Sequence, residues 1–566
     1  MKLDIIIVTY NSEKWLDKLI LSIENQRNID LNDLNLYFVD NVSKDNTIKV
    51  LKSKKENSKI KNFNIIENKK NLGFGKANNY GAKNGKSEYI FFLNPDIELE
   101  EDCIFNIFKY IKESKEDVGM WECRQKPYEH PKDYNPITLE TSWASGACII
   151  LRRDLFEKTN GFDEKIFMYA EDVDLSWHVR MYRYKIKYLP KAVVVHYCYE
   201  SSGQVKPTQY LNSIINNLNL RRKYGTLRQK IAWYKHFFKV LIRKGPFKGS
   251  RVSLIKYYIK NLRFIFYFNF WRFSKKRNIF LKEFKPNFYF FDYEIVRNGD
   301  FEKLYLQNET NSKPLVSIIM RTCGRPCVLR QTLNCLKNQT YSNFEIIIAE
   351  DGKNISEKMI KEEFKDLNIK YFCTEEKVGR CKTGNLALQK AVGKYFNFLD
   401  DDDLFYPDHI EVLVNKLEKN PDYNAAYTTS FESKINIISR EDKYEYEEIQ
   451  KVRTLERKFS RLILLRQNLF PIQSVMFNKS IYEKLGGFNL ELDNLEDWEL
   501  WARYAMNNKF LYIPKTTSIY HVPAKESNYS KRQEELDNYY KLAQGEILKN
   551  YINISAKDLL EEYLNL

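Results

Sequence analysis

The feature that most constrains this chain is an internal repeat. Leu3–Asn11 (LDIIIVTYN) matches Val316–Gly324 (VSIIMRTCG), and each stretch leads into a helical stretch and then a second apolar strand. Farther along, Asp96 and Asp402 are separated by 306 residues. After an insertion in the second copy, Gly161 and Gly487 are 326 residues apart, and a new offset of 325 residues is shared by Asp172 and Asp497 and by His196 and His521. Two constant offsets across motifs of different chemistry indicate a duplicated domain.

The order of elements in each copy predicts the fold class. Short apolar runs rich in β-branched residues alternate with helical stretches, which is typical of an α/β domain with a mostly parallel, doubly wound sheet. Ligands of such sheets bind beyond the carboxyl ends of the strands. Because the acidic turns follow the strands, we expect the turns of each copy to converge on one crevice. A chain of 566 residues has room for two such domains.

An apolar run ends in four consecutive carboxylates, Asp400–Asp403, in the second copy. In an extended backbone Asp400 and Asp402 share a face, while Asp401 points away. Clustered carboxylates suit Mg²⁺ or Mn²⁺, which can also bridge a diphosphate. The first copy has Asn94-Pro-Asp96 at the same place, with one acid fewer. The alternative interpretation is a solvated acidic turn without a ligand.

Both halves resemble inverting glycosyltransferases of glycosyltransferase family 2, which have the GT-A fold. The first half, with residues 71–75 (NLGFG) and 167–175 (FMYAEDVDL), is similar to rhamnosyltransferase-like members. The resemblance implies a GT-A domain over residues 1–205 and a second over 314–566. It also implies that a metal ion and the donor diphosphate are held by the acidic turn. The metal ligands implied are Asp96, Asp400, Asp402, His196 and His521, although the two histidines could equally be structural.

The resemblance also implies the residues that bind the nucleotide-sugar. The loop after the first strand would line the base, and the carboxylate after the second strand would accept a hydrogen bond from a pyrimidine ring, so UDP- or dTDP-linked donors are expected. At the position six residues after each Asp of the Glu-Asp pairs, the first copy has His178 where the family usually has arginine. The residues implied are Thr9, Tyr10, Asp40, Asn41, Asn79, Asn94, Thr322, Glu350, Asp351, Asn385, Asp401 and Arg503. For the acids among them, capping of the following helix is the alternative.

The Glu-Asp pairs supply a base for the reaction. Displacing a nucleoside diphosphate from an anomeric carbon with inversion requires deprotonation of the incoming hydroxyl group, which a carboxylate in hydrogen-bond reach can do. Asp172 and Asp497 fall on the catalytic-base position that the resemblance implies. Acids that only favour a helix N-terminus are the alternative.

The net charge of +16 is concentrated in one segment. Between Val205 and Lys285 there are 21 lysines and arginines and a single acid, Glu283. Tyrosine, phenylalanine and tryptophan interleave with these cations through a linker that we expect to be mainly helical, over residues 206–313. Such a composition suits the surface of an anionic membrane. It could also bind nucleic acid, or the acidic flanks of the chain's own two domains.

These observations predict a bifunctional inverting glycosyltransferase that adds sugars to a lipid-linked glycan acceptor in the synthesis of a bacterial surface polysaccharide. The nine cysteines are scattered and odd in number, which favours a cytoplasmic protein. No run of 18 apolar residues is present, so we expect the enzyme to lie on the inner face of the cell membrane without spanning it. A sugar nucleotidyltransferase is disfavoured because neither first strand is followed by Gly-x-Gly-Thr-Arg, and a non-catalytic adaptor leaves the acids unexplained. The main alternative is that one domain, the second in preference to the first, is catalytic and the other is a binding module. No nucleic-acid partner is expected.

Overall fold

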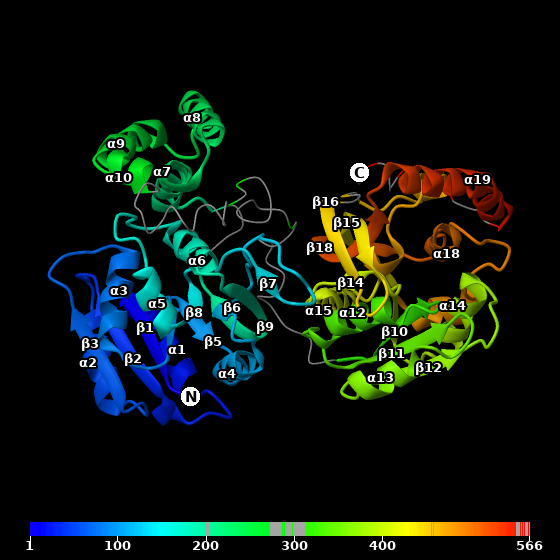
Figure 1. The fold of residues 1–566 in the computed structure, drawn as a ribbon, viewed down its shortest axis with the longest axis horizontal. Helices are drawn as coiled ribbons and strands as arrows, with labels where there is room; N and C mark the ends of the chain where they lie inside the picture. Colours follow the sequence, from blue (N-terminus) through cyan, green and yellow to red (C-terminus); the bar gives the residue numbers. More distant parts are fainter. Residues whose placement is uncertain are drawn as a thin grey trace. The chain divides into compact units, whose positions relative to one another are not determined.

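The protein was analysed as a computed structural model that describes residues 1–198, 204–271, 313–453 and 458–550, together with residues 286, 288, 297, 456, 555, 557, 560 and 564. The chain divides into two compact units (Figure 1). The first comprises residues 1–135 and 139–306, and the second comprises residues 136–138 and 307–566. Much of the predicted linker beyond Trp271 lies outside the described residues.

The first unit is built on a mixed sheet with the strand order β3-β2-β1-β4-β8-β6-β9-β5, and β7 pairs with β9. Its first half is parallel, and β8 runs antiparallel between β4 and β6. The strands are β1 (Leu3–Thr9), β2 (Leu34–Asp40), β3 (Asn62–Glu67), β4 (Tyr89–Leu93), β5 (Ile97–Leu99), β6 (Val118–Lys126), β7 (Glu140–Thr141), β8 (Cys148–Arg152) and β9 (Lys185–His196). The helices are α1 (Glu13–Glu24), α2 (Thr47–Asn57), α3 (Phe74–Asn84), α4 (Cys103–Glu113), α5 (Arg153–Thr159) and α6 (Glu171–Met181).

The second unit repeats this sheet, with the order β12-β11-β10-β13-β17-β15-β18-β14, and β16 pairs with β15. Its strands are β10 (Val316–Thr322), β11 (Phe344–Glu350), β12 (Ile369–Cys373), β13 (Tyr395–Phe398), β14 (Leu404–Phe405), β15 (Ala425–Ser439), β16 (Glu445–Arg453), β17 (Val475–Asn478) and β18 (Phe510–Pro523). Its helices are α12 (Pro326–Lys337), α13 (Glu357–Glu363), α14 (Arg380–Lys390), α15 (His409–Lys419), α16 (Arg461–Arg466), α17 (Lys479–Leu485), α18 (Glu496–Ala505) and α19 (Glu526–Asn550). The predicted duplication is therefore present in the strand order.

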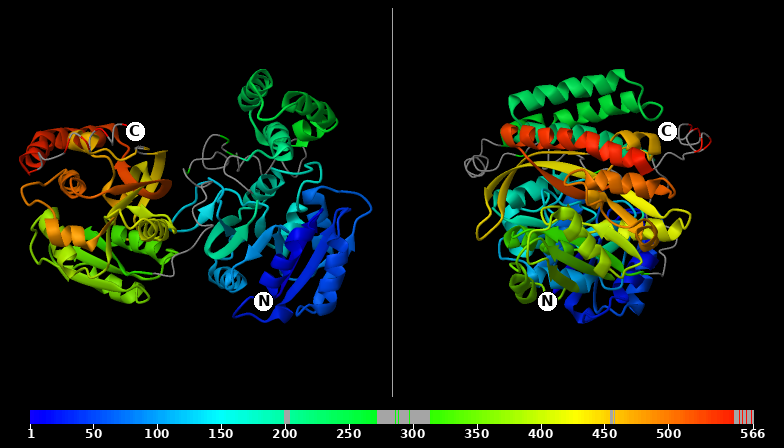
Figure 2. Two further views of the ribbon diagram at one scale, coloured as in Figure 1. Left: turned by 180° about the vertical axis from the view of Figure 1, so that it is seen from behind. Right: turned by 90° about the vertical axis from the view of Figure 1, so that its right-hand side faces the viewer.

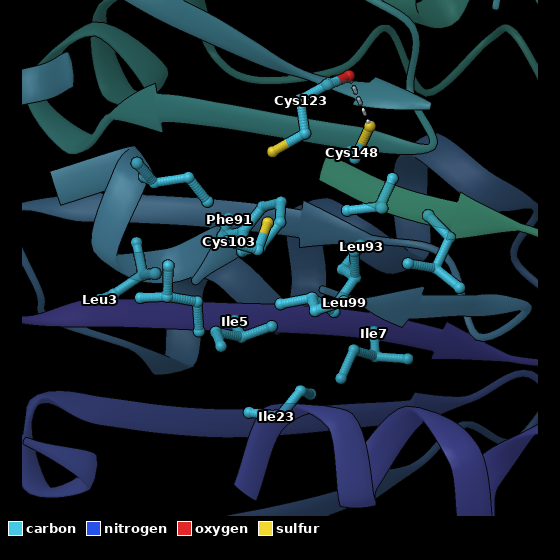
Figure 3. Close-up of a cluster of buried hydrophobic side chains, with 14 of the residues drawn as sticks. Leu3, Ile5, Ile7, Ile23, Phe91, Leu93, Leu99, Cys103, Cys123 and Cys148 are labelled. Atoms are coloured by element: carbon cyan, nitrogen blue, oxygen red, sulfur yellow. Dashed lines mark hydrogen bonds between the residues drawn. The ribbon is translucent and has the colours of Figure 1, made fainter. Parts of the chain in front are cut away.

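Alternation along β1 explains how helices cover both faces of the first sheet. Leu3, Ile5 and Ile7 point into one apolar cluster together with Leu16 and Ile23 of α1 (Figure 3). Ile6 and Val8 belong to a second cluster with Ala77 of α3, on the opposite face of the sheet. Successive side chains of a strand point to opposite faces, so a strand buried on both sides must be apolar throughout. The α/β fold class predicted from the sequence, with its GT-A arrangement, is confirmed.

Two additions distinguish the units. The insertion in the second copy corresponds to a long hairpin formed by β15 and β16. In the first unit a group of basic helices follows the sheet (Figures 1 and 2), in which α7 packs against α8, α9 and α10. These helices are α7 (Pro207–Tyr224), α8 (Leu227–Ile242), α9 (Ser250–Leu262) and α10 (Ile265–Phe270). Within the described ranges, no helix combines the length and the apolar character needed to cross a membrane.

Candidate active sites

The acidic turn of the second domain is held by two arginines. Arg321, on β10, donates to both carboxyl oxygens of Asp400 at 2.9 and 2.8 Å, and to Oε1 of Glu496 at 2.8 Å. Arg325 donates to Oδ2 of Asp401 at 3.1 Å and to Oδ2 of Asp402 at 3.2 Å. In the structure, therefore, Arg321 and Arg325 supply positive charge to the aspartates that were predicted to bind a metal ion.

The turn also departs from the extended geometry assumed for it. Strand β13 ends at Phe398, and residues 401–402 form a turn, so the alternation of faces along a strand does not apply to Asp400 and Asp402. Each faces a different arginine, and Asp401 is fully buried, accepting a hydrogen bond from Thr322 Oγ1 at 2.6 Å. Burial raises the pKa of Asp401 to about 7. Burial opposes ionisation of Asp400 too, but Arg321 outweighs it and holds the pKa of Asp400 below its usual value.

The predicted base of the second domain is oriented by two donors. Asp497 stands in the first turn of α18, where Oδ1 accepts from the backbone N–H of Trp498 and Oδ2 accepts from Asn468 Nδ2, both at 2.8 Å. Burial, and then the charge of Glu496, raises the pKa of Asp497 to about 7. A carboxylate with a pKa near neutrality is suited to accept a proton at physiological pH.

A cavity of about 1030 Å³ brings these elements of the second domain together. Its walls combine the loop after β10, the acidic turn and the start of α18 with two further elements, the β15–β16 hairpin and α19. The sequence-predicted residues that line it are Thr322, Asp351, Asp400, Asp401, Asp402, Asp497 and His521.

The histidine of each domain is fixed in one tautomer. In the second domain His521 Nδ1 donates to the backbone carbonyl of Asp402 at 2.6 Å. In the first domain His196 Nδ1 donates to Gln125 Oε1 at 2.8 Å, and His196 Nε2 lies 3.4 Å from Oδ1 of Asp96. A proton held on Nδ1 leaves Nε2 with a lone pair, as in metal-ligating histidines.

The predicted base of the first domain occupies the equivalent place. Asp172, in the first turn of α6, accepts from the backbone N–H groups of Gly146 and Val173, both at 2.8 Å. Burial raises the pKa of Asp172. Lys132, which is buried with Glu122 and donates to the Trp143 carbonyl at 2.6 Å, adds a positive charge that opposes this rise.

The nucleotide turns of the two domains differ in their hydrogen bonds. Asp351 accepts hydrogen bonds from the N–H groups of Val378, at 2.7 Å, and Gly379, at 3.2 Å. It lies on the cavity wall. Its counterpart Asn41 is 3% exposed, donates to the Gly73 carbonyl and accepts from the Leu72 N–H. Thr9 donates to the buried Asp40 at 3.0 Å, whereas Tyr10 is half exposed at the end of β1.

Four residues predicted to bind the nucleotide-sugar have structural roles in the fold. Asn79 and Asn385 each exchange two hydrogen bonds with the backbone of Phe162 and Phe488, respectively, so both of their amide atoms are engaged. Glu350 is fully buried and accepts from the N–H groups of Gly324, Ile355 and Ser356. Arg503 donates to both carboxyl oxygens of Glu499 and to the carbonyls of Leu485 and Gly487. The Arg503 guanidinium, predicted to bind the nucleotide-sugar, is therefore engaged by its own helix and by the loop before it.

The sequence reasoning missed several cavity residues. Arg321 could have been found, because it is a charged residue within an apolar strand where the first copy has Val8. Arg325, four residues later, carried no such signal. Asn468 and the α19 residues Arg532 and Glu535 come from segments with no counterpart among the repeated motifs.

The model of the family described as glycosyl transferase family 2 matches residues 4–186 and 317–485. The chain is similar to an uncharacterized glycosyltransferase of Methanocaldococcus jannaschii, with 29% identity over 41% of this chain and 79% of the relative. It is 31% identical to an uncharacterized glycosyltransferase of Haemophilus influenzae over 29% of this chain and 63% of the relative.

Two solved structures are similar at low identity. TarS residues 1–349 of S. aureus, in complex with UDP, has 17% identity, a TM-score of 0.30, and coverage of 48% of this chain and 73% of that chain. The mannosyltransferase PcManGT from Pyrobaculum calidifontis, in complex with GDP-Man and Mn²⁺, has 16% identity, a TM-score of 0.32, and coverage of 48% and 88%. Because the family model matches both halves and more than half of the whole chain, this protein belongs to glycosyl transferase family 2.

Proposed function

We propose that this chain is a bifunctional inverting glycosyltransferase, each domain of which transfers a sugar from a nucleoside diphosphate sugar to a glycan acceptor. The observation that carries the proposal is the second-domain cavity, where Asp351, Asp402 and Asp497 line one space of about 1030 Å³. This volume suits a nucleotide-sugar together with part of an acceptor. The first domain keeps Asp96 and Asp172 at the equivalent positions.

In the reaction, the acceptor oxygen bonds to the anomeric carbon while the bond from that carbon to the diphosphate oxygen breaks. The acceptor hydroxyl proton passes to the Asp497 carboxylate, and the nucleoside diphosphate departs with the electron pair. Asn468 and the Trp498 N–H hold both carboxyl oxygens of Asp497, which orients the base toward the cavity. Asp172, held by Gly146 and Val173, has the same role in the first domain.

A divalent cation, Mg²⁺ or Mn²⁺, fits the ligands available in each domain. Among the residues that the structure describes, no group of three or more His, Cys, Asp or Glu side chains is arranged to hold a metal. Mg²⁺ is, however, commonly bound through one or two protein ligands together with substrate phosphates. Asp96 with His196, and Asp402 with His521, would hold the ion, which when bound supplies positive charge to the departing diphosphate. UDP- or dTDP-linked donors remain the expectation from Asp351.

We further propose that α8, α9 and α10 attach the enzyme to an anionic membrane on its cytoplasmic face. Each helix carries exposed apolar side chains at spacings that share one face, such as Leu227 (73% exposed) and Ile242 (78% exposed) on α8. Residues 204–271 contain fifteen lysines and arginines and no acid. The exposed apolar side chains of these three helices include Leu227, Ile231, Phe238, Ile242, Val252, Ile255, Ile259, Leu262, Phe266 and Phe270.

Apolar stripes flanked by cations match the interface of an anionic leaflet. Lys223, at the end of α7, has a different partner, because it is fully buried against Asp163 and Asp174 of its own domain. Membrane attachment would bring the enzyme to a lipid-linked acceptor, as in the synthesis of a bacterial surface polysaccharide. Sedimentation with vesicles tests this step. Phe238→Ser with Ile242→Ser should release the chain from anionic vesicles, whereas Leu490→Ser, an exposed apolar residue of the second domain, should not.

The transfer activity is tested with the two base variants, Asp172→Asn and Asp497→Asn. Each should stop its own step with a loss of about a hundredfold or more, so that each accumulates a different intermediate, and a mixture of the two should restore the full product. Mass spectrometry of the products is the measurement. Identical products from wild type and Asp172→Asn would instead mean that the second domain alone is catalytic.

A further inference from the structure

The first domain buries an ion pair at a place where the second domain has aromatic packing. Lys132 pairs with Glu122 of β6, and their side chains are only 4% and 3% exposed. The strand pairings of the two sheets place Tyr427 of β15 at the position of Glu122. Tyr427 is buried and stacks on Phe470, with ring centres 4.7 Å apart. Removing two charges from water is costly, so the ion pair calls for a function.

The ion pair holds the loop that leads into β8, residues 143–146. Lys132 Nζ donates to the Trp143 carbonyl at 2.6 Å and lies 4.6 Å from the centre of the Trp143 ring. Oε1 of Glu122 accepts from the backbone N–H of Ser145 at 3.0 Å. A carbonyl and an N–H group of this loop are therefore each bonded to one member of the pair.

The same loop holds the proposed base. The Gly146 N–H donates to Oδ2 of Asp172 at 2.8 Å. The Ala144 N–H donates to Ser176 Oγ at 3.0 Å, and the Ser176 hydroxyl donates to the Asp172 carbonyl at 2.7 Å. A Cβ atom added at Gly146 would lie 3.3 Å from Cβ of Asp172, so the loop backbone approaches the base closely. A shift of the ion pair would therefore be transmitted to Asp172 through the loop.

The ion pair also sets the charges around the base. Burial raises the pKa of Asp172, and the positive charge of Lys132 opposes that rise. Burial raises the pKa values of Glu122 and Glu171 as well, and the charge of Asp172 adds to both shifts. The next acid of α6, Asp174, is paired with a lysine of α7. Because repulsion between carboxylates is mutual, the two members of the ion pair act on the base in opposite directions.

We propose that Lys132 is a positioning residue of the first domain, which holds Asp172 through Glu122 and the loop 143–146 and keeps a positive charge beside it. This inference rests on the proposed function, in which Asp172 accepts the proton of the acceptor hydroxyl group. It means that the two domains prepare their bases by different means. The first uses a buried cation, and the second uses the neutral side chain of Asn468.

The test is the pH dependence of nucleotide release from UDP-glucose, UDP-N-acetylglucosamine and dTDP-glucose by the full chain that carries Asp497→Asn. In this hydrolysis water replaces the acceptor. The water oxygen bonds to the anomeric carbon, a water proton passes to Asp172, and the nucleoside diphosphate departs with the electron pair. The rate should fall as the pH drops below the pKa of Asp172, and the position of this acid limb is the quantity compared between variants.

The two members of the ion pair predict opposite shifts of the acid limb. Lys132→Met should move it to higher pH by about one unit or more, because Asp172 loses the nearby cation and keeps the nearby anion. Glu122→Gln should move it to lower pH, because the anion is lost and the cation remains. The glutamine amide oxygen can still accept from the Ser145 N–H. An ion pair that only stabilised the fold would give the same change in both variants.

A matched control and a second readout complete the experiment. Arg153→Met breaks the ion pair with the buried Asp4, near the start of β1, and should leave the acid limb unchanged. The carboxyl ¹³C resonance of Asp172, assigned by its absence in Asp172→Asn, reports the same titration without turnover. It should show the same opposite shifts in Lys132→Met and Glu122→Gln.

The outcomes separate this inference from the proposed function. If no probe is hydrolysed in a way that depends on Asp172, the proposed function of the first domain fails, and the ¹³C titration decides the inference by itself. Shifts in the same direction, or no shift, in the two folded variants would overturn the role of Lys132. If Lys132→Met does not fold, Glu122→Gln decides alone. A titration of Asp172 that does not move to lower pH in that variant contradicts the inference.

Discussion

Helices α6 and α18, which carry the two proposed bases, each contain a buried acid at the equivalent position, and the two acids are neutralised by different cations. On α18, Glu499 is paired with Arg503, which lies four residues later in the same helix, at 2.8 Å. On α6 the equivalent acid is Asp174, and His178 stands where the arginine would be. The cation comes instead from α7, where Lys223 Nζ lies 2.7 and 2.8 Å from the two oxygens of Asp174 and 2.8 Å from Asp163.

This difference shows that α7 is part of the first domain. His178 stacks on Trp271 with ring centres 5.3 Å apart, and its Nε2 lies 3.0 Å from the hydroxyl oxygen of Tyr224. Leu220 and Phe288 cover Trp177 from the same side. The basic segment therefore completes the hydrophobic and ionic packing of α6, while the second domain satisfies α18 from within its own helix.

The largest expected effect follows from removing this support. Residues 1–205, expressed alone, should not give a folded domain, because Asp163 and Asp174 would be buried without a cation and Trp177 would be uncovered. Residues 1–306 should fold. Circular dichroism in the near ultraviolet and thermal unfolding measure the difference. A cooperative unfolding transition in residues 1–205 would show that the first domain folds without α7.

A point substitution sharpens the same comparison. In the full chain, Lys223→Met should destabilise the first domain by about 3–5 kcal/mol, the range for removing one partner of a buried ion pair. Arg503→Met should do the same to the second domain, since Arg503 also holds the backbone before α18. The measurement is the denaturation of each variant, in which the unfolding transitions of the two domains are recorded separately. Only the transition of the substituted domain should shift.

Arg321 gives the next effect. Arg321→Val leaves Asp400 and Glu496 without their cation, so we expect a loss of about 3 kcal/mol or more in the second domain. Adding Asp400→Asn, which reproduces the first-domain residues, should recover most of that loss. Equal stability of the single and double variants would show that Arg321 and Asp400 are not coupled.

The fold was predictable because its determinants are local in sequence. Apolar strands, helical stretches and their constant offsets recur in both copies, and the strand order follows from them. The proposed bases and metal-side acids come from spacings that recur in both copies of the chain. Lys223 was not, because its partner Asp174 is 49 residues away and no local pattern marks a buried lysine at a helix end. Asn79 and Asn385 were predicted to bind a ligand because their backbone partners, 83 and 103 residues away, are not visible in the sequence.

The pH dependence of the second domain is a smaller effect. Asp497 acts only when deprotonated, and its pKa is raised to about 7 by burial and then by the charge of Glu496. The rate of transfer by the second domain should therefore fall as the pH drops below 7, by about tenfold for each unit. The measurement is kcat against pH in the Asp172→Asn background. Burial also raises the pKa of Asp172, so the acid limb of the first domain, measured in Asp497→Asn, should lie above the usual range of an aspartate.

The smallest expected effect concerns a feature that the two domains share. Asn79 and Asn385 each join their α3 or α14 helix to the backbone of Phe162 or Phe488 through one donated and one accepted hydrogen bond. Replacing either by alanine should cost about 1–3 kcal/mol, because a buried N–H and a buried carbonyl lose their partners. If the asparagines only stabilise the fold, the affinity of each variant for UDP should stay within about twofold of wild type. This change is smaller than the loss of affinity caused by removing one hydrogen bond to a ligand. Calorimetric titration with UDP, alongside the thermal unfolding of each variant, is the measurement. If one variant loses UDP affinity without losing stability, that asparagine contacts the nucleotide. The two asparagines would then have different roles in the two domains.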